Sequence, residues 1–285
     1  MRPDFIATQA YPFMQRAQQR GHAWEDQLEN AMREAAEAGL DGWEPIVRTP
    51  DQVEGIALAA KRHRLEMPSI YIGGAMHDEV EGRRTFENMV AIAEKARPWG
   101  VRFILINPNP IDWKGKENKT DGQLILQASL LAALGGRFHE MGLRLCYHSH
   151  DAEMRASARE FHHMLTATDP NHVRLCLDPH WIYRGAENSE IALHDIITHY
   201  GDRIELVHLR QSRDGIWDEI LGPGDLDHEH LATRFTALDL QPLLVLERAL
   251  EEGTPETMSD VEAHRRSAAY ARQLFASARA EGSHA

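Results

Sequence analysis

The chain has 285 residues, 42% of them hydrophobic, which is enough to bury a large core. Its formal net charge is −13, with 44 acidic and 31 basic side chains and no long basic block. Nucleic-acid binding needs a basic surface, so we expect no nucleic-acid partner. The absence of long apolar runs excludes a membrane-spanning helix, and the first residues lack the apolar segment of a signal peptide, so we expect a cytoplasmic protein without a membrane partner. Cys146 and Cys176 lie in apolar strands, which favours free thiols over disulfides.

The first half of the chain alternates short apolar strands with helices. We predict strands at residues 4–9, 42–47, 69–74 and 102–107, with helices at residues 24–38, from residue 49, and at 80–98. Residues 10–13 read as a loop, and Gly39 is a suitable residue to close the first helix. Thr49 is the predicted N-cap of the next helix, with Pro50 at its first position. Gly73 and Gly74 end the third strand and let a ligand approach the backbone closely.

The second half continues the same alternation. Strands are predicted at residues 144–150, 173–178, 204–210 and 242–247, and helices at residues 120–141, 152–167, 191–200 and 258–278. Residues 211–227, which contain Gly222-Pro-Gly224, form the longest irregular stretch of this half. Eight strands that alternate with helices indicate a parallel sheet, and eight such units favour a closed barrel. No Gly-x-Gly-x-x-Gly turn follows a strand, so we predict one α/β domain over residues 1–285, a single (β/α)8 TIM barrel.

Ionisable residues stand where four successive predicted strands end. Catalytic groups of TIM barrels lie at the C-terminal ends of the strands. Side chains alternate along a strand, so His148 and His150 share one face. The next three strand ends supply two pairs, Asp178 with His180 and His208 with Arg210, and the single residue Glu247. Carboxylates combined with imidazoles are suitable ligands for a divalent ion, with Mn²⁺ as our first expectation and Mg²⁺, Co²⁺ or Zn²⁺ as alternatives.

Each of these residues also has a purely structural interpretation. Glu153 lies in the first turn of the next helix, where a carboxylate favours the helix dipole. His148 can be a hydrogen-bonded core histidine, and Asp178 before Pro179 can be a turn residue. Arg210 can pair with a carboxylate or bind substrate oxygens. Burying Asp178 near another carboxylate without a cation would cost several kcal/mol, so the joint occurrence favours a metal site.

These motifs resemble the xylose isomerase-like TIM barrels, the sugar phosphate isomerase/epimerase superfamily, along nearly the whole chain. The matching segments are Tyr147-His-Ser-His-Asp-Ala-Glu153, Leu177-Asp-Pro-His-Trp181, Val207-His-Leu-Arg210, Leu221-Gly-Pro-Gly-Asp225, Val245-Leu-Glu247 and Glu34 to Glu44. The resemblance implies a metal held by a strand-five carboxylate together with Asp178, His208 and Glu247. It also implies that Glu44 and the glycines at the end of the third strand line the substrate pocket.

The fifth strand departs from the pattern of many epimerases in the superfamily. Those enzymes carry their first metal ligand as a Glu inside this strand, where the present chain has His148. Glu153 can reach back to replace that ligand, or His148 or His150 can bind the ion instead. A His-x-His-Asp-x-Glu segment is similar to inosose dehydratase-like enzymes and to lyases that act on 3-keto sugars.

The resemblance leads to two enzymatic hypotheses with one metal site. The first is a sugar or keto-sugar isomerase or epimerase that removes a proton next to a carbonyl through a metal-stabilised enediolate. The second is a dehydratase or deglycosidase that eliminates a β-substituent from a 3-keto sugar. A barrel that binds sugar without turnover is less favoured, and a nuclease of the same fold is disfavoured by the acidic charge. We expect a homo-oligomer, with a small second subunit in the deglycosidase case.

The residue roles follow from this reading and are our predictions. The metal ligands are Glu153, Asp178, His208 and Glu247; the catalytic acid–base residues are His148, His150 and Glu247; the substrate-binding residues are Glu44, Asn107, His180 and Arg210.

Overall fold

The structure is a computed structural model that describes Arg2 and residues 4–282. The chain divides into two compact units. Unit 1 comprises Met1–Ile46, Ile56–Met67 and Val207–Ala285, and unit 2 comprises Val47–Gly55 and Pro68–Leu206. The boundaries between them fall inside helix α3 (Gln52–Arg62) and inside strand β7 (Ile204–Leu209).

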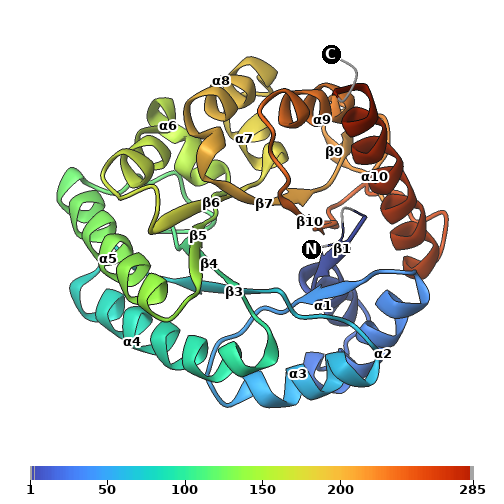
Figure 1. Cartoon of the computed structure of the whole chain (residues 1–285), viewed down its shortest axis with the longest axis horizontal. Coiled ribbons are helices and arrows are strands. Elements are labelled where there is room, and N and C mark those ends of the chain that lie inside the picture. Colours follow the sequence, from blue (N-terminus) through green and yellow to red (C-terminus); the bar gives the residue numbers. More distant parts are fainter. Residues whose placement is uncertain (1, 3, 283–285) are drawn as a thin grey trace. The chain divides into compact units, whose positions relative to one another are not determined.

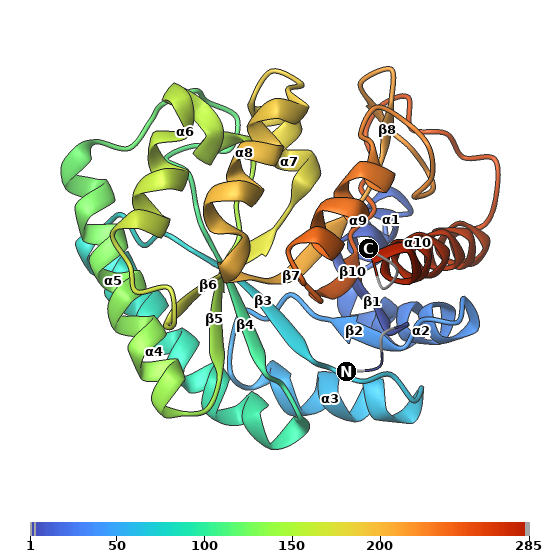
Figure 2. The same cartoon turned by 45° about the horizontal axis from the view of Figure 1, so that its top comes forward.

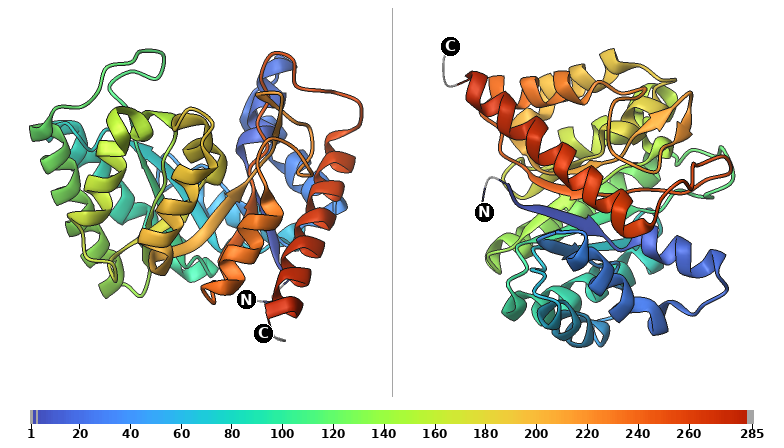
Figure 3. Two further views of the ribbon diagram at one scale, coloured as in Figure 1. Left: turned by 90° about the horizontal axis from the view of Figure 1, so that it is seen from above. Right: turned by 90° about the vertical axis from the view of Figure 1, so that its right-hand side faces the viewer.

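Unit 1 contains a strand order β2-β1-β10-β7 (Figure 1). Its remaining strands are β1 (Ile6–Gln9), β2 (Gly42–Glu44) and β10 (Leu243–Leu246), and β1 pairs in parallel with both β2 and β10. Its helices are α1 (Tyr11–Gln19), α2 (Trp24–Glu37), α9 (His228–Ala237) and α10 (Asp260–Gly282). Helix α10 packs on α9, α2 and β1. It is the long red helix in both views of Figure 3. A short antiparallel hairpin, β8 (Ser212–Arg213) with β9 (Ile216–Trp217), follows β7.

Unit 2 contains the parallel strand order β6-β5-β4-β3. These strands are β3 (Ser69–Gly74), β4 (Phe103–Pro108), β5 (Arg144–Tyr147) and β6 (Val173–Leu177). Its helices are α4 (Glu79–Ala96), α5 (Asp121–Glu140), α6 (Asp151–Thr166), α7 (Pro179–Gly185) and α8 (Glu190–Tyr200), with short 3₁₀ segments η1 (Arg97–Trp99) and η2 (Gly201–Arg203). Figures 1 and 2 show α4 and α5 along the outer side of these strands. The strands are fully buried along most of their length, which explains their continuous apolar sequences.

Local sequence signals account for most helix ends. Thr120 accepts a hydrogen bond from the backbone N–H of Gln123, whose side chain in turn accepts from the Thr120 N–H, so α5 begins with a capping box. Asp78 caps α4 in the same manner, through the N–H groups of Val80 and Glu81. Gly39 has φ +82°, a conformation that favours glycine, and closes the turn after α2 as predicted.

Two helix starts differ from the sequence prediction. Residues 11–13 open helix α1 instead of a loop, because Pro12 occupies the first turn, where no backbone donor is needed. Helix α3 begins at Gln52, later than predicted, because the Gln52 side chain accepts hydrogen bonds from the N–H groups of Arg48 and Thr49 and forms the preceding turn. Helices α7 and α9 and the hairpin β8–β9 were not predicted as separate elements.

The region after β5 is less regular than predicted. The strand ends at Tyr147, although the N–H of His148 still donates to the carbonyl of Ile106 on β4 at 2.9 Å. His150 stands at the N-cap of α6 with extended backbone. Within α6, residues 155–158 leave helical geometry, so this element is two helical segments joined by a kink.

Among the described residues, none of the helices is both long enough and apolar enough to cross a membrane.

Candidate active site

Unit 1 brings one histidine between two carboxylates. His208, near the end of β7, has its Nε2 atom 2.9 Å from Oε1 of Glu44 and its Nδ1 atom 2.8 Å from Oε2 of Glu247. Glu44 ends β2, and Glu247 directly follows β10, so all three groups come from C-terminal strand ends. Glu44 and His208 are fully buried, and Glu247 is 4% exposed. The predicted metal ligands His208 and Glu247 are therefore in direct contact.

The geometry of this group fits a divalent cation. A neutral imidazole can donate one hydrogen bond, so His208 can satisfy one of its two carboxylate neighbours in this way. Two ligand atoms about 2.1 Å from one ion, at a right angle, lie about 3.0 Å apart, close to both separations at His208. The donor set of imidazole and carboxylate oxygen is the one that Mn²⁺, Mg²⁺, Co²⁺ and Zn²⁺ accept.

Arg210 lies beside the same carboxylates. Its guanidinium donates to Oε2 of Glu247, and it also lies 5.2 Å from the ring of Trp217 on β9. Burial and the Glu247 charge raise the pKa of Tyr11, and Arg210 lowers it, so the Tyr11 phenol also lies in this electrostatic environment. Arg210 therefore pairs with a carboxylate, which is one of the two roles that the sequence allowed for it.

Unit 2 brings the other predicted site residues to the ends of β5 and β6. The Nε2 atom of His148 lies 3.6 Å from Oδ2 of Asp178, and both side chains are fully buried. Oδ1 of Asp178 accepts the N–H groups of His180 and Trp181 and so caps α7. This cap leaves Oδ2 directed at His148. Their separation exceeds hydrogen-bond range but equals that of two ligands about 2.1 Å from one ion at roughly 120°.

His150 is surrounded by aromatic rings. Its ring centroid lies 5.0 Å from that of His148, 5.2 Å from Trp113 and 5.3 Å from Trp181. Trp113 belongs to the loop after β4 and is 57% exposed. His148 also meets Tyr71 of β3 edge to face at 5.3 Å. The structure therefore places the predicted catalytic residues His148 and His150 side by side. His150 is partly exposed and lies among aromatic rings, whereas His148 is fully buried.

Glu153 contacts the backbone of His150. Its Oε2 atom accepts the backbone N–H of His150 at 2.7 Å, and its side chain is fully buried. Its electrostatic neighbours are Glu160 and Lys119. The carboxylate thus stabilises the start of α6, which is the structural alternative that the sequence offered for it.

The remaining predicted substrate residues are buried at strand ends of unit 2. Asn107 in β4 and His180 in α7 are each 1% exposed. The His180 ring packs against Tyr183 at 5.5 Å. Neither the burial of these two residues nor the ring contact of His180 indicates a substrate.

Several residues near these groups escaped the sequence analysis. Lys119 is 2% exposed, and its ammonium lies 2.5 Å from Oε1 of Glu160, although its loop reads as a solvated polar stretch. Gln211, next to Arg210, is buried and binds Gly222, Leu226 and Ser212 through its amide. No pattern of residue types marks either one, because their roles depend on tertiary packing.

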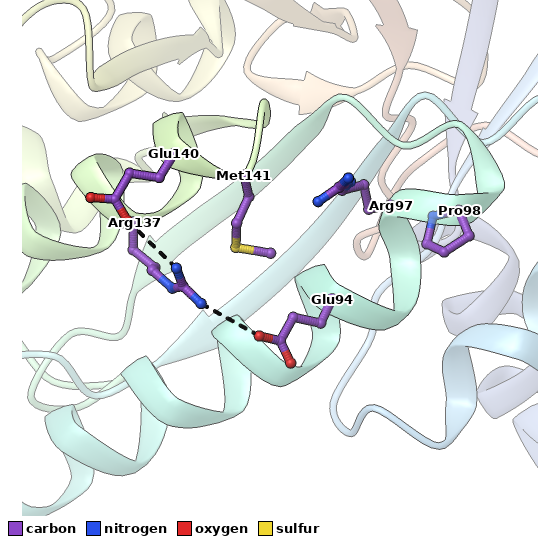
Figure 4. Close-up of a pocket in the computed structure, with 6 residues that line it drawn as sticks. All are labelled: Glu94, Arg97, Pro98, Arg137, Glu140 and Met141. Atoms are coloured by element: carbon purple, nitrogen blue, oxygen red, sulfur yellow. Dashed lines mark hydrogen bonds and ion pairs between the residues drawn. The ribbon is translucent and has the colours of Figure 1, made fainter.

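A surface pocket elsewhere in unit 2 holds none of the predicted residues. It has a volume of about 480 Å³ and is lined by residues of α4, η1 and α5, namely Glu94, Arg97, Pro98, Arg137, Glu140 and Met141. Figure 4 shows Arg137 paired with Glu94 and Glu140. These charges largely balance one another, so the pocket does not suggest a charged ligand.

Comparison with known proteins identifies the fold. Residues 32–273 match the family described as xylose isomerase-like TIM barrel, which confirms the predicted (β/α)8 barrel. A solved sugar phosphate isomerase/epimerase from Parabacteroides distasonis is similar with a TM-score of 0.72 and 15% identity, over 95% of this chain and 94% of that one. A xylose isomerase-like protein from Mycobacterium smegmatis, solved in complex with magnesium, has a TM-score of 0.69 and 13% identity, with 88% and 89% covered.

A curated relative detected from sequence is an inosose dehydratase. The Geobacillus kaustophilus enzyme is 27% identical over 203 residues. The match covers 67% of this chain and 63% of the relative, so the chain spans less than two thirds of that enzyme's length.

Proposed function

Because the chain belongs to the xylose isomerase-like TIM barrel family, we propose that it is a divalent-metal-dependent enzyme acting on a sugar or a related keto-polyol. The observation that carries this proposal is the position of His208 between Glu44 and Glu247. We propose that His208 and Glu247 of unit 1 bind a divalent ion. In unit 2, His148 beside Asp178 takes the place of Glu153 as the candidate ligand after strand β5, because the Glu153 carboxylate caps α6.

In this proposal Glu44 positions His208 and does not bind the ion. Metal-bound histidines commonly donate their second ring N–H to a carboxylate, which fixes the tautomer and strengthens the ligand. In the metal-bound form we propose that Nε2 of His208, 2.9 Å from Glu44, carries the proton, and that Nδ1, 2.8 Å from Glu247, faces the cation. Arg210 donates a hydrogen bond to Glu247 and so orients its carboxylate.

The bound ion supplies Lewis acidity toward a carbonyl and a neighbouring hydroxyl of the substrate. The chain itself supplies the proton transfer. His150 is the proposed base, since its ring is partly exposed whereas His148 is fully buried. A base must come within about 2.6–3.2 Å of the proton that it removes, and a partly exposed imidazole can meet this requirement.

Elimination is the outcome that we favour after proton removal. An epimerase that works through two carboxylates needs an acid on each face of the carbon, whereas strand five here offers imidazoles. The sequence relative is an inosose dehydratase, which supports loss of water from a keto-polyol. Isomerisation or epimerisation, the first expectation from the sequence, is the second candidate, supported by the pair of carboxylates around His208.

Solvent-deuterium exchange tests the proposal. Purified protein with Mn²⁺ is incubated in D₂O with inososes, ketoses and 3-keto glycosides, and NMR follows the carbon-bound protons. Loss of water from an inosose supports the dehydratase, and deuterium in a recovered or epimeric sugar supports the isomerase. Absence of both exchange and elimination, in a protein that binds no metal by elemental analysis, would overturn the enzymatic proposal.

A further inference from the structure

The backbone of His150 is held by a buried acid. The N–H of His150 donates to Oε2 of Glu153 at 2.7 Å, at the point where the chain leaves β5 and enters α6. His150 lies outside the strand, which ends at Tyr147. The bond to Glu153 therefore fixes the residue whose ring stands among Trp113, Trp181 and His148.

Tyr147, just before the two histidines, faces the helix layer. Tyr147 alternates with His148 along the chain, so it points to the opposite side, where its ring packs on Phe161 of α6 at 5.9 Å. Burial, followed by the charge of Glu153, raises the pKa of the Tyr147 phenol. Glu153 is therefore an electrostatic neighbour of Tyr147.

Lys119 and Glu160 are the charged neighbours of this carboxyl. Lys119, at the end of the loop after β4, pairs with Glu160 of α6 at 2.5 Å, and Gln127 of α5 donates to the same oxygen of Glu160 at 2.8 Å. The ammonium of Lys119 is thus committed to Glu160. The second oxygen of Glu153 has no hydrogen-bond partner among the described residues. The cluster gives Glu153 one strong hydrogen bond, the one to His150.

We propose that Glu153 is a positioning residue, which sets the orientation of His150 through its backbone N–H and takes no part in metal binding. This inference rests on the proposed function only for the role of His150 in turnover. Because Gln can accept the same bond with its amide oxygen, Glu153→Gln should preserve the position, whereas Glu153→Ala should release it.

The test compares Glu153→Ala, Glu153→Gln and Asp151→Asn. Asp151 is the matched control, because it is an acid in the same helical turn and pairs with Arg155. In metal-free protein labelled with ¹⁵N-histidine, amide exchange of His150 should be at least about tenfold faster in Glu153→Ala, and close to the wild-type rate in the other two variants. This measurement needs no substrate, so it stands even if the proposed function fails.

Turnover and metal content complete the test. With Mn²⁺ and the most active substrate of the exchange panel, Glu153→Ala should lower kcat about 100-fold with little change in KM, as expected for a misplaced base. Glu153→Gln should restore most of kcat, and all three variants should retain bound metal. Loss of metal in Glu153→Ala or Glu153→Gln would make Glu153 a ligand and overturn the inference. Unchanged exchange at His150 in Glu153→Ala would overturn it as well.

Discussion

The Nε2 atom of His208 lies 2.9 Å from Oε1 of Glu44, and both side chains are fully buried. A buried carboxylate is costly unless a donor or cation compensates it. A neutral His208 ring can donate to Glu44 through Nε2 or to Glu247 through Nδ1, but not to both. Replacing Glu44 should therefore change the affinity for a cation bound next to His208.

Glu44→Gln should lower affinity for Mn²⁺ by about 10- to 100-fold, the usual effect of removing the carboxylate behind a metal-bound histidine. His208→Ala should lower it further, because a ligand is lost. Calorimetric titration of metal-free protein with MnCl₂ measures both changes. Glu37→Gln, on the exposed side of α2, is the control. Equal Mn²⁺ affinity in the wild type, Glu44→Gln and His208→Ala would contradict the proposed site.

The ion pair between the buried Lys119 and the partly buried Glu160 should contribute strongly to the stability of unit 2. Lys119→Met leaves the Glu160 charge without its cation, a change that typically costs about 3–5 kcal/mol in a buried pair. The double variant Lys119→Met/Glu160→Gln should recover part of this loss, since it removes the uncompensated charge. Urea unfolding measures the differences.

Lys116→Met is the matched control for Lys119, because Lys116 lies in the same loop and is exposed. It should change the free energy of unfolding by less than about 0.5 kcal/mol. A similar small change in Lys119→Met would mean that the pair contributes little.

The fold could be predicted from the sequence because its signals are local. Strand β3 spans the predicted residues, Ser69–Gly74, and the capping box at Thr120 marks the start of α5. Apolar runs of strand length and capping residues depend on neighbours in the chain, so they are visible without the structure. The start of α1 was missed because Pro12 is typical of both a loop and a first helical turn.

The site could be predicted in part. The sequence predicted correctly that His208 and Glu247 are neighbours, because both stand at the ends of parallel strands, whose carboxyl ends lie at one edge. The role of Glu153 could not be decided, because a carboxylate three residues after His150 suits both a helix cap and a ligand. Its neighbour Lys119 comes from a distant position in the chain and carries no sequence signal, although Glu160 belongs to the same helix as Glu153.

His264 should make unit 1 sensitive to acid. Burial and the neighbouring Arg248 lower the pKa of His264 to about 3, and its ring stacks on Phe13 at 4.7 Å. Between pH 6.5 and pH 3 the unfolded chain binds this proton and the folded chain does not, so stability falls as the pH falls. At pH 4.5 the loss should reach about 2–3 kcal/mol relative to pH 7.

His264→Phe should remove this loss, because phenylalanine can stack on Phe13 and does not titrate. Urea unfolding at pH 7 and pH 4.5 gives the comparison, and His22→Phe controls for the same change at an exposed position. An equal acid-induced loss in wild type and His264→Phe would show that another group causes it.

Glu153 should make the folded protein less stable as the pH rises, which is the opposite of the effect of His264. Burial, followed by the charge of Glu160, raises the pKa of Glu153 to about 7, while Lys119 lowers it. Between pH 4.5 and pH 7 the folded chain holds this proton and the unfolded chain does not, so stability falls as the pH rises. Glu153→Gln cannot ionise and should be up to about 3 kcal/mol more stable, relative to wild type, at pH 8 than at pH 4.5.

The measurement is the difference in unfolding free energy between wild type and Glu153→Gln from pH 4.5 to pH 8, with Asp151→Asn as the control in the same helical turn. A difference that stays constant with pH would contradict a buried, titrating Glu153.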